Sequence, residues 1–389
     1  MSEFDSYSKM NEQAVKLIKA AIQYATGNVL FSPLNLMTTL ALAAVGARGE
    51  TSRELAGALG VPTVKMDRFV REILDELANE NGRTLLTYFA ALFDENMEVT
   101  YEYAHSLEKC FDSRVGRADF SNGEDVAEKI NSEIDKNTCG MLRNVVSPAD
   151  ISGDLQMVLL GTLYFCSRWE YPFDKSDTED MDFYLSNDEK KQVPMMYQRE
   201  SFPYFNSEGD GVHGVILPCR KSDCEIVALM PIDPVEPVSR LVEKLNHSSL
   251  ERWIKSADAD EDVAVYLPRF ALTHRLDDAT KILKRMGVAT VFTDAADLSG
   301  ICGSTPLKLD RIVHAVCMEI DENGARAAAA TVMCHVAGAP PIIRKHREFK
   351  ANRPFVVLIR HKTTELLLFA ALVKDPDPGR PWCKRMIGN

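Results

Sequence analysis

The sequence predicts an α+β fold, on three observations. From Met1 to about Gly140 apolar residues recur every three or four positions, as they do in amphipathic helices. From about Leu155 onward the apolar period shortens to two, or becomes a short apolar run, and both patterns favour strands. Strands and helices do not alternate regularly, and no linker rich in Pro, Gly or Ser divides the chain. We therefore expect one mixed domain rather than a row of βαβ units.

The individual elements follow from the same patterns. Helices are expected in the first half at residues 34–47 and 64–80, and again at residues 238–254 and 276–287, where the helical period returns. Strands are expected where short apolar runs occur, at residues 157–165, 211–218, 224–231, 262–272, 354–361 and 365–373. The domain is predicted to cover residues 1–375, and the polar residues 376–389 form a C-terminal tail.

Composition narrows the function classes. The 389 residues are 46% hydrophobic and 26% charged, which is typical of a soluble globular protein. A net charge of −12 argues against nucleic acid or an anionic membrane as partner, and no apolar run approaches membrane-spanning length. The nine cysteines include no CxxC pair and no Cys/His cluster at metal-ligand spacing, so we expect thiols and no metal or other cofactor.

The first residues bear on localisation. They are polar and then amphipathic, without the apolar core of a secretory signal, which predicts a cytoplasmic protein. An extracellular location stays open if a leader has been trimmed or if export is unconventional.

Eight segments, taken in order along the chain, resemble the motifs of one known protein family. The most specific is ANRPFVVLIRHKTTELLLFAALVKDP, around Pro354 and Phe355. The others are NVLFSPLNLMTTLALAAVGARGETSREL, INSEIDKNTCGML, LYFCSRWEYPF, VPMM, LPRF, LKRMGVATVFTDAADLSGI and HAVCMEIDENGARAAAAT. Together these segments resemble the serpin family from about Asn28 to Pro376, and the type that the resemblance suggests is the intracellular, ovalbumin-like one.

The resemblance implies a fold and a mechanism. The fold has three β-sheets, eight to nine helices and an exposed reactive-centre loop at about residues 322–348. A monomer of this kind is not an enzyme but a suicide substrate of a serine protease. The protease cleaves the loop and forms an acyl-enzyme, and the upstream half of the loop then inserts into the large sheet.

The hinge of that loop has the composition that insertion requires. Alternate side chains must enter the core side of the sheet, and Ala325, Ala327, Ala329 and Thr331 are small enough to do so. Arg326 falls on the opposite parity, where a long side chain stays in water. The hinge is assigned to Glu322, Gly324, Ala325, Ala327, Ala328, Ala329, Ala330 and Thr331.

The resemblance also implies a polar cluster that gates the large sheet, made in this family of two serines, an asparagine and a histidine. Ser32 and His314 match it, whereas Asn35 stands where the second serine is usual and Gly161 where the asparagine is. Asn35 could supply the missing amide from the other side, since its side chain both donates and accepts. Trp169 is assigned to the same gate.

The scissile bond is ambiguous. Counting from Gly324 places it between Gly338 and Ala339, which suits an elastase-like pocket. Counting back from the C-terminal motif places it near Ile343 and Arg344, and a cut after Arg344 or Lys345 would suit a trypsin-like pocket. The basic run at residues 344–350 is a possible polyanion site.

Three alternatives remain beside an inhibitor of serine proteases. One is a non-inhibitory serpin that acts as a carrier or chaperone, which would need a hinge that cannot insert. Another is inhibition of a cysteine protease by the same trap. An enzyme is the least supported, because neither Ser32 nor Ser299 lies in a GxSxG turn.

Overall fold

The computed structural model describes residues 3–78, 85–151, 155–165, 167–186, 188–259, 261–276, 279–325 and 346–377. The α-helices in these ranges are α1 (Glu3–Tyr24), α2 (Pro33–Gly46), α3 (Gly49–Leu59), α4 (Met66–Ala78), α5 (Tyr101–Phe111), α6 (Gly123–Asn137), α7 (Val238–Lys244), α8 (His247–Lys255), α9 (Ala279–Arg285) and α10 (Ser299–Cys302). The described ranges thus contain ten α-helices where eight or nine were expected, because the four residues of α10 form a separate helical turn. No helix within them is long and apolar enough to span a membrane.

Strands make up most of the remaining regular structure. They are β1 (Val29–Phe31), β2 (Leu85–Asp94), β3 (Arg114–Ala118), β4 (Met157–Phe165), β5 (Ser167–Arg168), β6 (Glu179–Tyr184), β7 (Lys190–Ser201), β8 (Tyr204–Ser207), β9 (Val212–Pro218), β10 (Cys224–Pro231), β11 (Asp262–Pro268), β12 (Phe270–Arg275), β13 (Arg311–Ile320), β14 (Gly324–Ala325), β15 (Arg347–Lys350), β16 (Phe355–His361) and β17 (Leu367–Val373). All six expected strand regions are confirmed, one of them as the pair β11 and β12.

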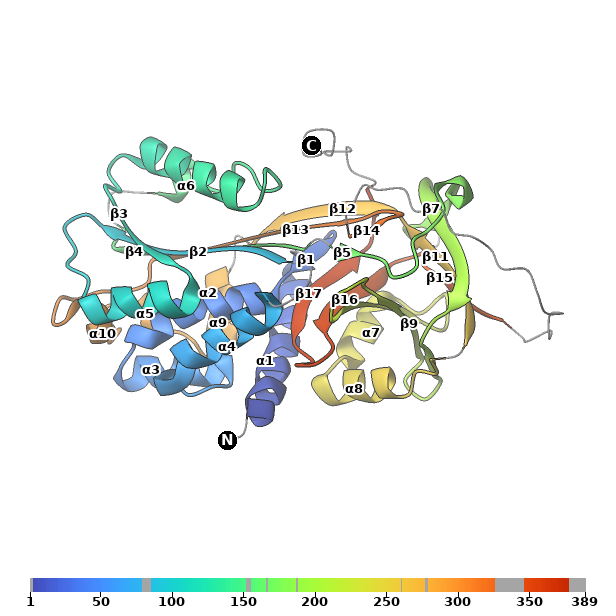
Figure 1. Ribbon diagram of the computed structural model, residues 1–389, viewed down its shortest axis with the longest axis horizontal. Coiled ribbons are helices and arrows are strands. Elements are labelled where there is room, and N and C mark those ends of the chain that lie inside the picture. Colours follow the sequence, from blue (N-terminus) through green and yellow to red (C-terminus); the bar gives the residue numbers. More distant parts are fainter. Residues whose placement is uncertain are drawn as a thin grey trace.

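The strands form three larger sheets and one short pair, which confirms an α+β fold with three sheets (Figure 1). The six-stranded sheet has the order β1-β17-β16-β10-β9-β8, and the four-stranded sheet has the order β15-β11-β7-β6. The five-stranded sheet has the order β12-β13-β4-β2-β3. In that sheet β13 lies parallel to β4, whereas β12 and β2 are antiparallel to their inner neighbours.

The first half of the chain is less purely helical than the sequence suggested. Besides α1 to α6 it contains β1, β2 and β3. The β2 segment LLTYFAALFD is rich in residues that also favour helices, and it becomes a strand through its full-length antiparallel pairing with β4, from Leu85↔Phe165 to Phe93↔Met157. Tertiary pairing overrides local propensity here.

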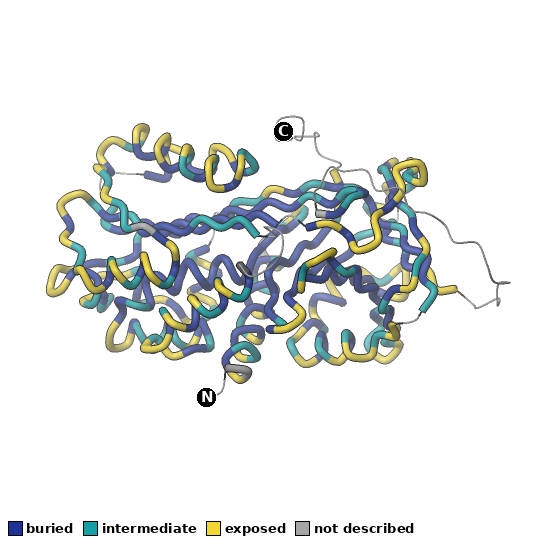
Figure 2. The backbone as a smooth tube through the Cα atoms, viewed as in Figure 1, coloured by how far each residue is buried: buried dark blue, intermediate teal, exposed yellow. Residues whose placement is uncertain are grey.

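The five-stranded sheet is covered on both faces. One face packs against α2 and the main core, and alternate residues of the other face, such as Leu160 and Val313, pack against Ile130 and Ile134 of α6. Figure 1 shows α6 on one side of the sheet and α2, α4 and α5 on the other. Double coverage explains why every residue of β4 is buried, and the strands form the dark interior in Figure 2.

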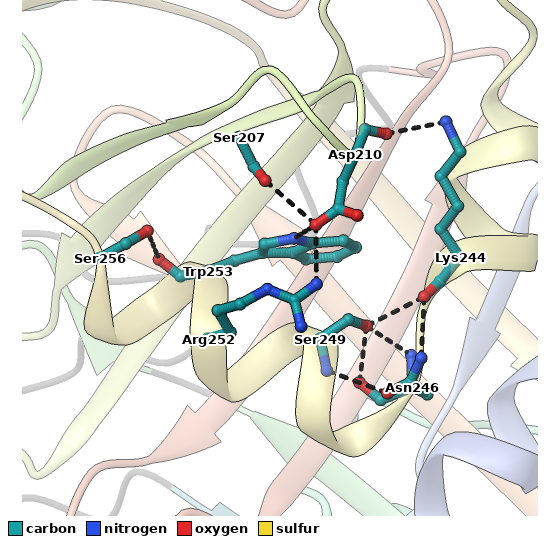
Figure 3. Close-up of polar contacts among 8 residues, drawn as sticks. All are labelled: Ser207, Asp210, Lys244, Asn246, Ser249, Arg252, Trp253 and Ser256. Carbon is teal, nitrogen blue, oxygen red and sulfur yellow. Dashed lines mark hydrogen bonds and ion pairs between the residues drawn. The ribbon is translucent and has the colours of Figure 1, made fainter.

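The region around α7 and α8 is fixed by one carboxylate at the turn between β8 and β9 (Figure 3). Asp210 accepts hydrogen bonds from Trp253 Nε1 at 2.7 Å, Arg252 at 2.8 Å and Ser207 Oγ at 3.0 Å. The Trp253 and Arg252 donors outweigh burial and lower the pKa of Asp210 to about 2. Lys244 Nζ also donates to the Asp210 carbonyl at 2.7 Å, so this turn, α7 and α8 are tied together.

Candidate functional site

The centre of the five-stranded sheet contains a seam between two parallel strands, β13 and β4. Their register runs from Arg311↔Val158 to Cys317↔Tyr164 and places His314 directly opposite Gly161. We call this the β4–β13 seam. The expected hinge leaves the C-terminal end of β13, so it begins beside the seam.

The first turn of α2 lies beneath the middle of the seam. Ser32 caps the helix, and Pro33 follows at the first helical position, where its missing N–H costs nothing. Ser32 Oγ accepts the Asn35 N–H at 3.0 Å and donates to the Leu368 carbonyl at 2.6 Å. The cap therefore joins α2 to β17 of the six-stranded sheet and fixes where Asn35 lies.

His314 is fully buried and links β13 to this turn. Its Nε2 accepts the Ser32 N–H at 3.5 Å, so that in the neutral ring Nδ1 donates to Asn35 Oδ1 at 2.9 Å. Burial, with a smaller contribution from His274, lowers the pKa of His314 to about 3. The imidazole is thus neutral at physiological pH.

Gly161 leaves the space that the neighbouring polar groups of α2 occupy. A Cβ on Gly161 would lie 2.6 Å from Asn35 Oδ1 and closer still to Thr39 Oγ1. Thr39 Oγ1 also donates to the Asn35 carbonyl at 2.7 Å. An amide supplied by α2 therefore requires a residue without a side chain on β4, which fits the expectation that Asn35 takes over from the usual asparagine.

Three buried polar atoms around the seam have no hydrogen-bond partner among the described residues: Asn35 Nδ2, Thr38 Oγ1 and Thr162 Oγ1. Each such group carries a desolvation cost of about 1–3 kcal/mol. The closed seam therefore contains unused hydrogen-bonding capacity, an uncommon feature for the middle of a core.

The base of the hinge is clamped to β5. Gly324 pairs with Arg168 in a short antiparallel ladder, and at φ 143° its backbone lies so close to β5 that an added Cβ would be 2.6 Å from Arg168 Cα. Asp321 Oδ1 accepts the backbone N–H groups of Asn323 at 2.8 Å and Gly324 at 3.2 Å. Glycine is thus required at position 324 by both conformation and space.

Trp169 belongs to this clamp and not to the polar cluster. Its indole N–H donates to the Asp321 carbonyl at 2.8 Å, and its backbone N–H donates to the Asn323 carbonyl at 3.1 Å. The structure thus brings Ser32, Asn35, Gly161 and His314 together but places Trp169 at the hinge base. The indole lies eight residues beyond Gly161 on an extended segment, too far along the chain to reach the cluster.

Glu322 is a buried carboxylate of the hinge base, 3% exposed. It accepts a hydrogen bond from Thr178 Oγ1 at 3.1 Å and pairs with Arg269 at 3.5 Å. Its backbone carbonyl accepts the Phe173 N–H at 2.9 Å. The hinge base is therefore held through its side chains as well as its backbone.

The other end of the seam, where β4 and β13 both begin, is held by charges. Asp150 pairs with Arg275 of β12 at 2.5 Å and with Arg311 of β13 at 2.7 Å. Asp310 Oδ2 accepts the backbone N–H groups of Gln156 at 2.6 Å and Met157 at 3.0 Å. We call this set the ionic latch, because it ties the segment leading into β4 to β12 and β13.

Several expected site residues lie outside the described residues. These are the hinge positions Ala327, Ala328, Ala329, Ala330 and Thr331 and the reactive-bond candidates Gly338, Ala339, Arg344 and Lys345.

Sequence reasoning missed Thr39 and the ionic latch. Thr39 follows Asn35 by one helical turn, and that spacing could have revealed it. Asp150 is separated from Arg275 by 125 residues and from Arg311 by 161, so no local signal marks this set. No group of three or more His, Cys, Asp or Glu side chains in the described part of the chain is arranged to hold a metal ion.

Comparison with known proteins identifies the class. The family model described as Serpin (serine protease inhibitor) matches residues 8–376, so this chain belongs to the serpin family. It is 30% identical over 388 residues to the leukocyte elastase inhibitor of Xenopus tropicalis, covering 96% of this chain and 97% of that protein. It is 32% identical over 360 residues to a serine protease inhibitor of Cyanea capillata, covering 90% and 93%.

The fold agrees with a solved structure of the family. Serpin48 of the insect Tenebrio molitor superposes with a TM-score of 0.83 at 28% identity, covering 96% of this chain and 98% of that one. Sheets and helices thus correspond over nearly the whole length of both proteins.

Proposed function

We propose that this chain is a serine protease inhibitor that acts as a suicide substrate, trapping the acyl-enzyme when the cleaved hinge enters the β4–β13 seam. The observation that carries the proposal is the parallel pairing of β4 with β13, the strand from which the hinge leaves. A chain that turns back from the end of β13 runs antiparallel to both strands. Insertion therefore exchanges one parallel ladder for two antiparallel ladders, which pair slightly better.

The energetics favour insertion once the loop is cut. Pairing about fourteen residues, at roughly 1 kcal/mol net per hydrogen bond, gives on the order of 10 kcal/mol. The unpartnered atoms around the closed seam, Asn35 Nδ2 among them, would meet new backbone groups when the strands part. Before cleavage the fold is metastable and is protected by a barrier.

The hinge sequence supports the same proposal. Gly324 and Ala325 already pair as a strand with β5, so the hinge begins in an extended conformation. Ala327 and Ala329 carry only a methyl group on the parity that would face the core. A carrier without inhibitory activity would be expected to have a bulky or charged residue there.

Two classes of target protease stay open, and they differ in the scissile residue that their specificity pockets accept. A basic scissile residue, Arg344 or Lys345, would favour a trypsin-like protease, and a cut between Gly338 and Ala339 would favour an elastase-like one. The name of the Xenopus relative, leukocyte elastase inhibitor, supports including an elastase in any test.

A polyanion is proposed as an accessory partner at residues 344–350. Within its described part the Arg347 guanidinium pairs with Glu261 at 3.4 Å and lies 6.0 Å from the Tyr204 ring centroid, while Lys350 Nζ lies 5.0 Å from the Tyr266 ring centroid. Because Arg347 is already paired, the attraction to a polyanion would be moderate and sensitive to salt. The proposed inhibitor acts as a monomer in the cytoplasm.

The test is to mix the protein with a trypsin-like, an elastase-like and a papain-like protease and look for complexes that survive boiling in detergent. The variant Ala329→Glu should be cleaved without trapping, because it would force a charge into the core. The matched variant Arg326→Glu carries the same charge on the opposite parity and should still inhibit. Complexes with a serine protease support the proposal. Complexes with the papain-like enzyme alone would contradict it and indicate that the target is a cysteine protease.

Cleavage without any complex, by every protease in the panel, would contradict inhibition and favour the carrier or chaperone alternative. The mass of the released C-terminal fragment locates the cut: a fragment that begins at Lys345 supports a trypsin-like target, and one that begins at Ala339 an elastase-like target. Replacing Arg344 by Ala should abolish only the former complexes.

A further inference from the structure

The turn between β9 and β10 brings two cysteines together. The β9–β10 register pairs Glu225 with Pro218, and one step further out Cys219 lies opposite Cys224, where its N–H donates to the Cys224 carbonyl at 3.2 Å. Residues directly opposite in an antiparallel arrangement project to the same face, with Cα atoms about 4.5–5.5 Å apart. Disulfides span Cα separations of about 4.4–6.8 Å. Both residues are thiols in this structure.

The register extends this pair into a row. Cys224 is opposite His361 of β16, and Cys219 is opposite Trp169. The two cysteines thus lie next to each other in a row of four residues, between His361 and Trp169.

We propose that Cys219 and Cys224 form a reversible cross-strand disulfide, with a low-molecular-weight disulfide such as oxidised glutathione as oxidant. The thiolate of one cysteine attacks one glutathione sulfur, which forms a mixed disulfide and releases the first glutathione. The other cysteine, as thiolate, then attacks the sulfur of the first cysteine and releases the second glutathione. Two electrons pass from the cysteines to glutathione, and the two thiol protons end on the two released glutathiones.

Access to the pair is through the turn itself. Cys219 is 4% exposed and Cys224 is fully buried, but Arg220, Lys221 and Asp223 of the connecting turn are exposed. The ladder ends one step before this pair, at Glu225 and Pro218, and a hairpin end opens locally at far lower cost than the sheet interior. An oxidant therefore reaches the sulfurs without global unfolding.

The pair is mechanically connected to the hinge base. Residues 167–170 lie between them: Arg220 N–H donates to the Arg168 carbonyl at 2.7 Å, and Glu170 N–H donates to the Pro218 carbonyl at 2.9 Å. The same segment carries the Trp169 hydrogen bonds and the β5–β14 pairing that hold residues 321–325. A covalent link across the turn removes the fraying of the strand end to which this clamp is attached. The disulfide thus stiffens the clamp, whether or not the chain inhibits a protease.

The direct test is peptide mapping of the full chain after equilibration in glutathione buffers of increasing oxidised fraction, with remaining thiols alkylated. Trypsin cuts after Arg220 and Lys221, between the two cysteines, so the disulfide joins the peptides 200–220 and 222–240. We expect this joined pair, lighter by two hydrogens than the sum of its parts, in the wild type and in Cys302→Ser, a control at another buried thiol. Cys219→Ser should lack it.

Separate peptides in fully oxidised buffer, whether alkylated or carrying glutathione, would overturn the proposal, and this readout uses the wild type even if Cys219→Ser folds poorly. The proposed stiffening of the hinge-base clamp by the disulfide is tested by hydrogen exchange of the oxidised and reduced forms. Amides of residues 167–170 and 321–325 should exchange several-fold more slowly after oxidation, while those of β11 stay unchanged. Equal rates at 167–170 and 321–325 in the two forms would contradict the coupling.

Discussion

The β4–β13 seam is held by two opposite kinds of polar interaction. At its centre the contacts are neutral and wholly buried, around His314 and Asn35, and one amide donor is unused. At the end where both strands begin, Asp150 is ion-paired with two arginines that remain partly exposed. The difference indicates that the centre costs little to open, whereas the ionic latch resists the last part of any strand insertion.

The largest expected effect comes from breaking the latch. Asp150→Asn leaves Arg275 and Arg311 without their carboxylate and should lower the free energy of unfolding by about 3 kcal/mol, since the acid is buried although both arginines are partly exposed. Chemical denaturation measures it. The control Asp135→Asn removes a surface ion pair with Arg143 and should change stability by less than about 1 kcal/mol. An equal loss of unfolding free energy in the two variants would show that the ionic latch contributes no more than a surface ion pair.

The latch should also be sensitive to acid. Burial alone would raise the pKa of Asp150, but hydrogen bonds from Arg275 and Ser147 outweigh it and hold that pKa well below its usual range. A lowered pKa in the folded state stabilises the protein above the unfolded pKa, about 3.9, and that contribution fades as the pH falls below it. The stability gap between the wild type and Asp150→Asn should therefore shrink below about pH 4. A gap independent of pH would contradict this assignment.

At the centre of the β4–β13 seam, the destabilising change should be a steric clash and not the loss of a charge. Gly161→Ala places a methyl group against Thr39 and Asn35 and should cost about 2 kcal/mol. Adding Thr39→Ala removes the nearer obstacle, so the double variant should lose less than the sum of the single losses. Gly57→Ala, whose added methyl would meet no atom within 4 Å, should be neutral or slightly stabilising. Strict additivity of the Gly161 and Thr39 changes would refute the close contact.

The smallest effect expected concerns the histidine of the centre. Because the pKa of His314 is lowered to about 3 by burial, the unfolded chain binds a proton near pH 6.5 that the folded chain rejects. Stability should therefore fall by about 1–2 kcal/mol between about pH 7 and about pH 5, through this group alone. His314→Gln should flatten that slope, and His105→Gln, at an exposed position, should leave it unchanged. A slope retained in His314→Gln would contradict the buried neutral imidazole.

The sequence predicted the features that local patterns encode. The family motifs and the change of apolar period led to three sheets, and the positions of Ser32, Asn35, Gly161 and His314 led to one cluster, which the structure brings together. Asn35 stands in place of a serine and Gly161 in place of an asparagine. The two changes compensate each other, because Gly161 leaves the space that the Asn35 amide occupies.

What sequence reasoning could not supply depends on contacts between distant segments. Trp169 was assigned to the gate, whereas its indole N–H binds the Asp321 carbonyl at the hinge base. The first 140 residues were expected to be mainly helical and no strand was assigned at β2, because its apolar run is ambiguous until β4 pairs with it. The pairing of Cys219 with Cys224 depends on where the β9–β10 turn begins, which composition does not reveal.

The central claim, that the hinge can enter the β4–β13 seam, is tested most directly by the melting temperature of the intact chain and of the chain cut within residues 326–345. Calorimetry at one pH on both forms is sufficient. The account predicts that the cut chain melts well above the intact one, because the released hinge pairs between β4 and β13, and that cut Ala329→Glu gains much less. A cut wild-type chain that melts at or below the intact protein would contradict insertion and, with it, the proposed inhibitory mechanism.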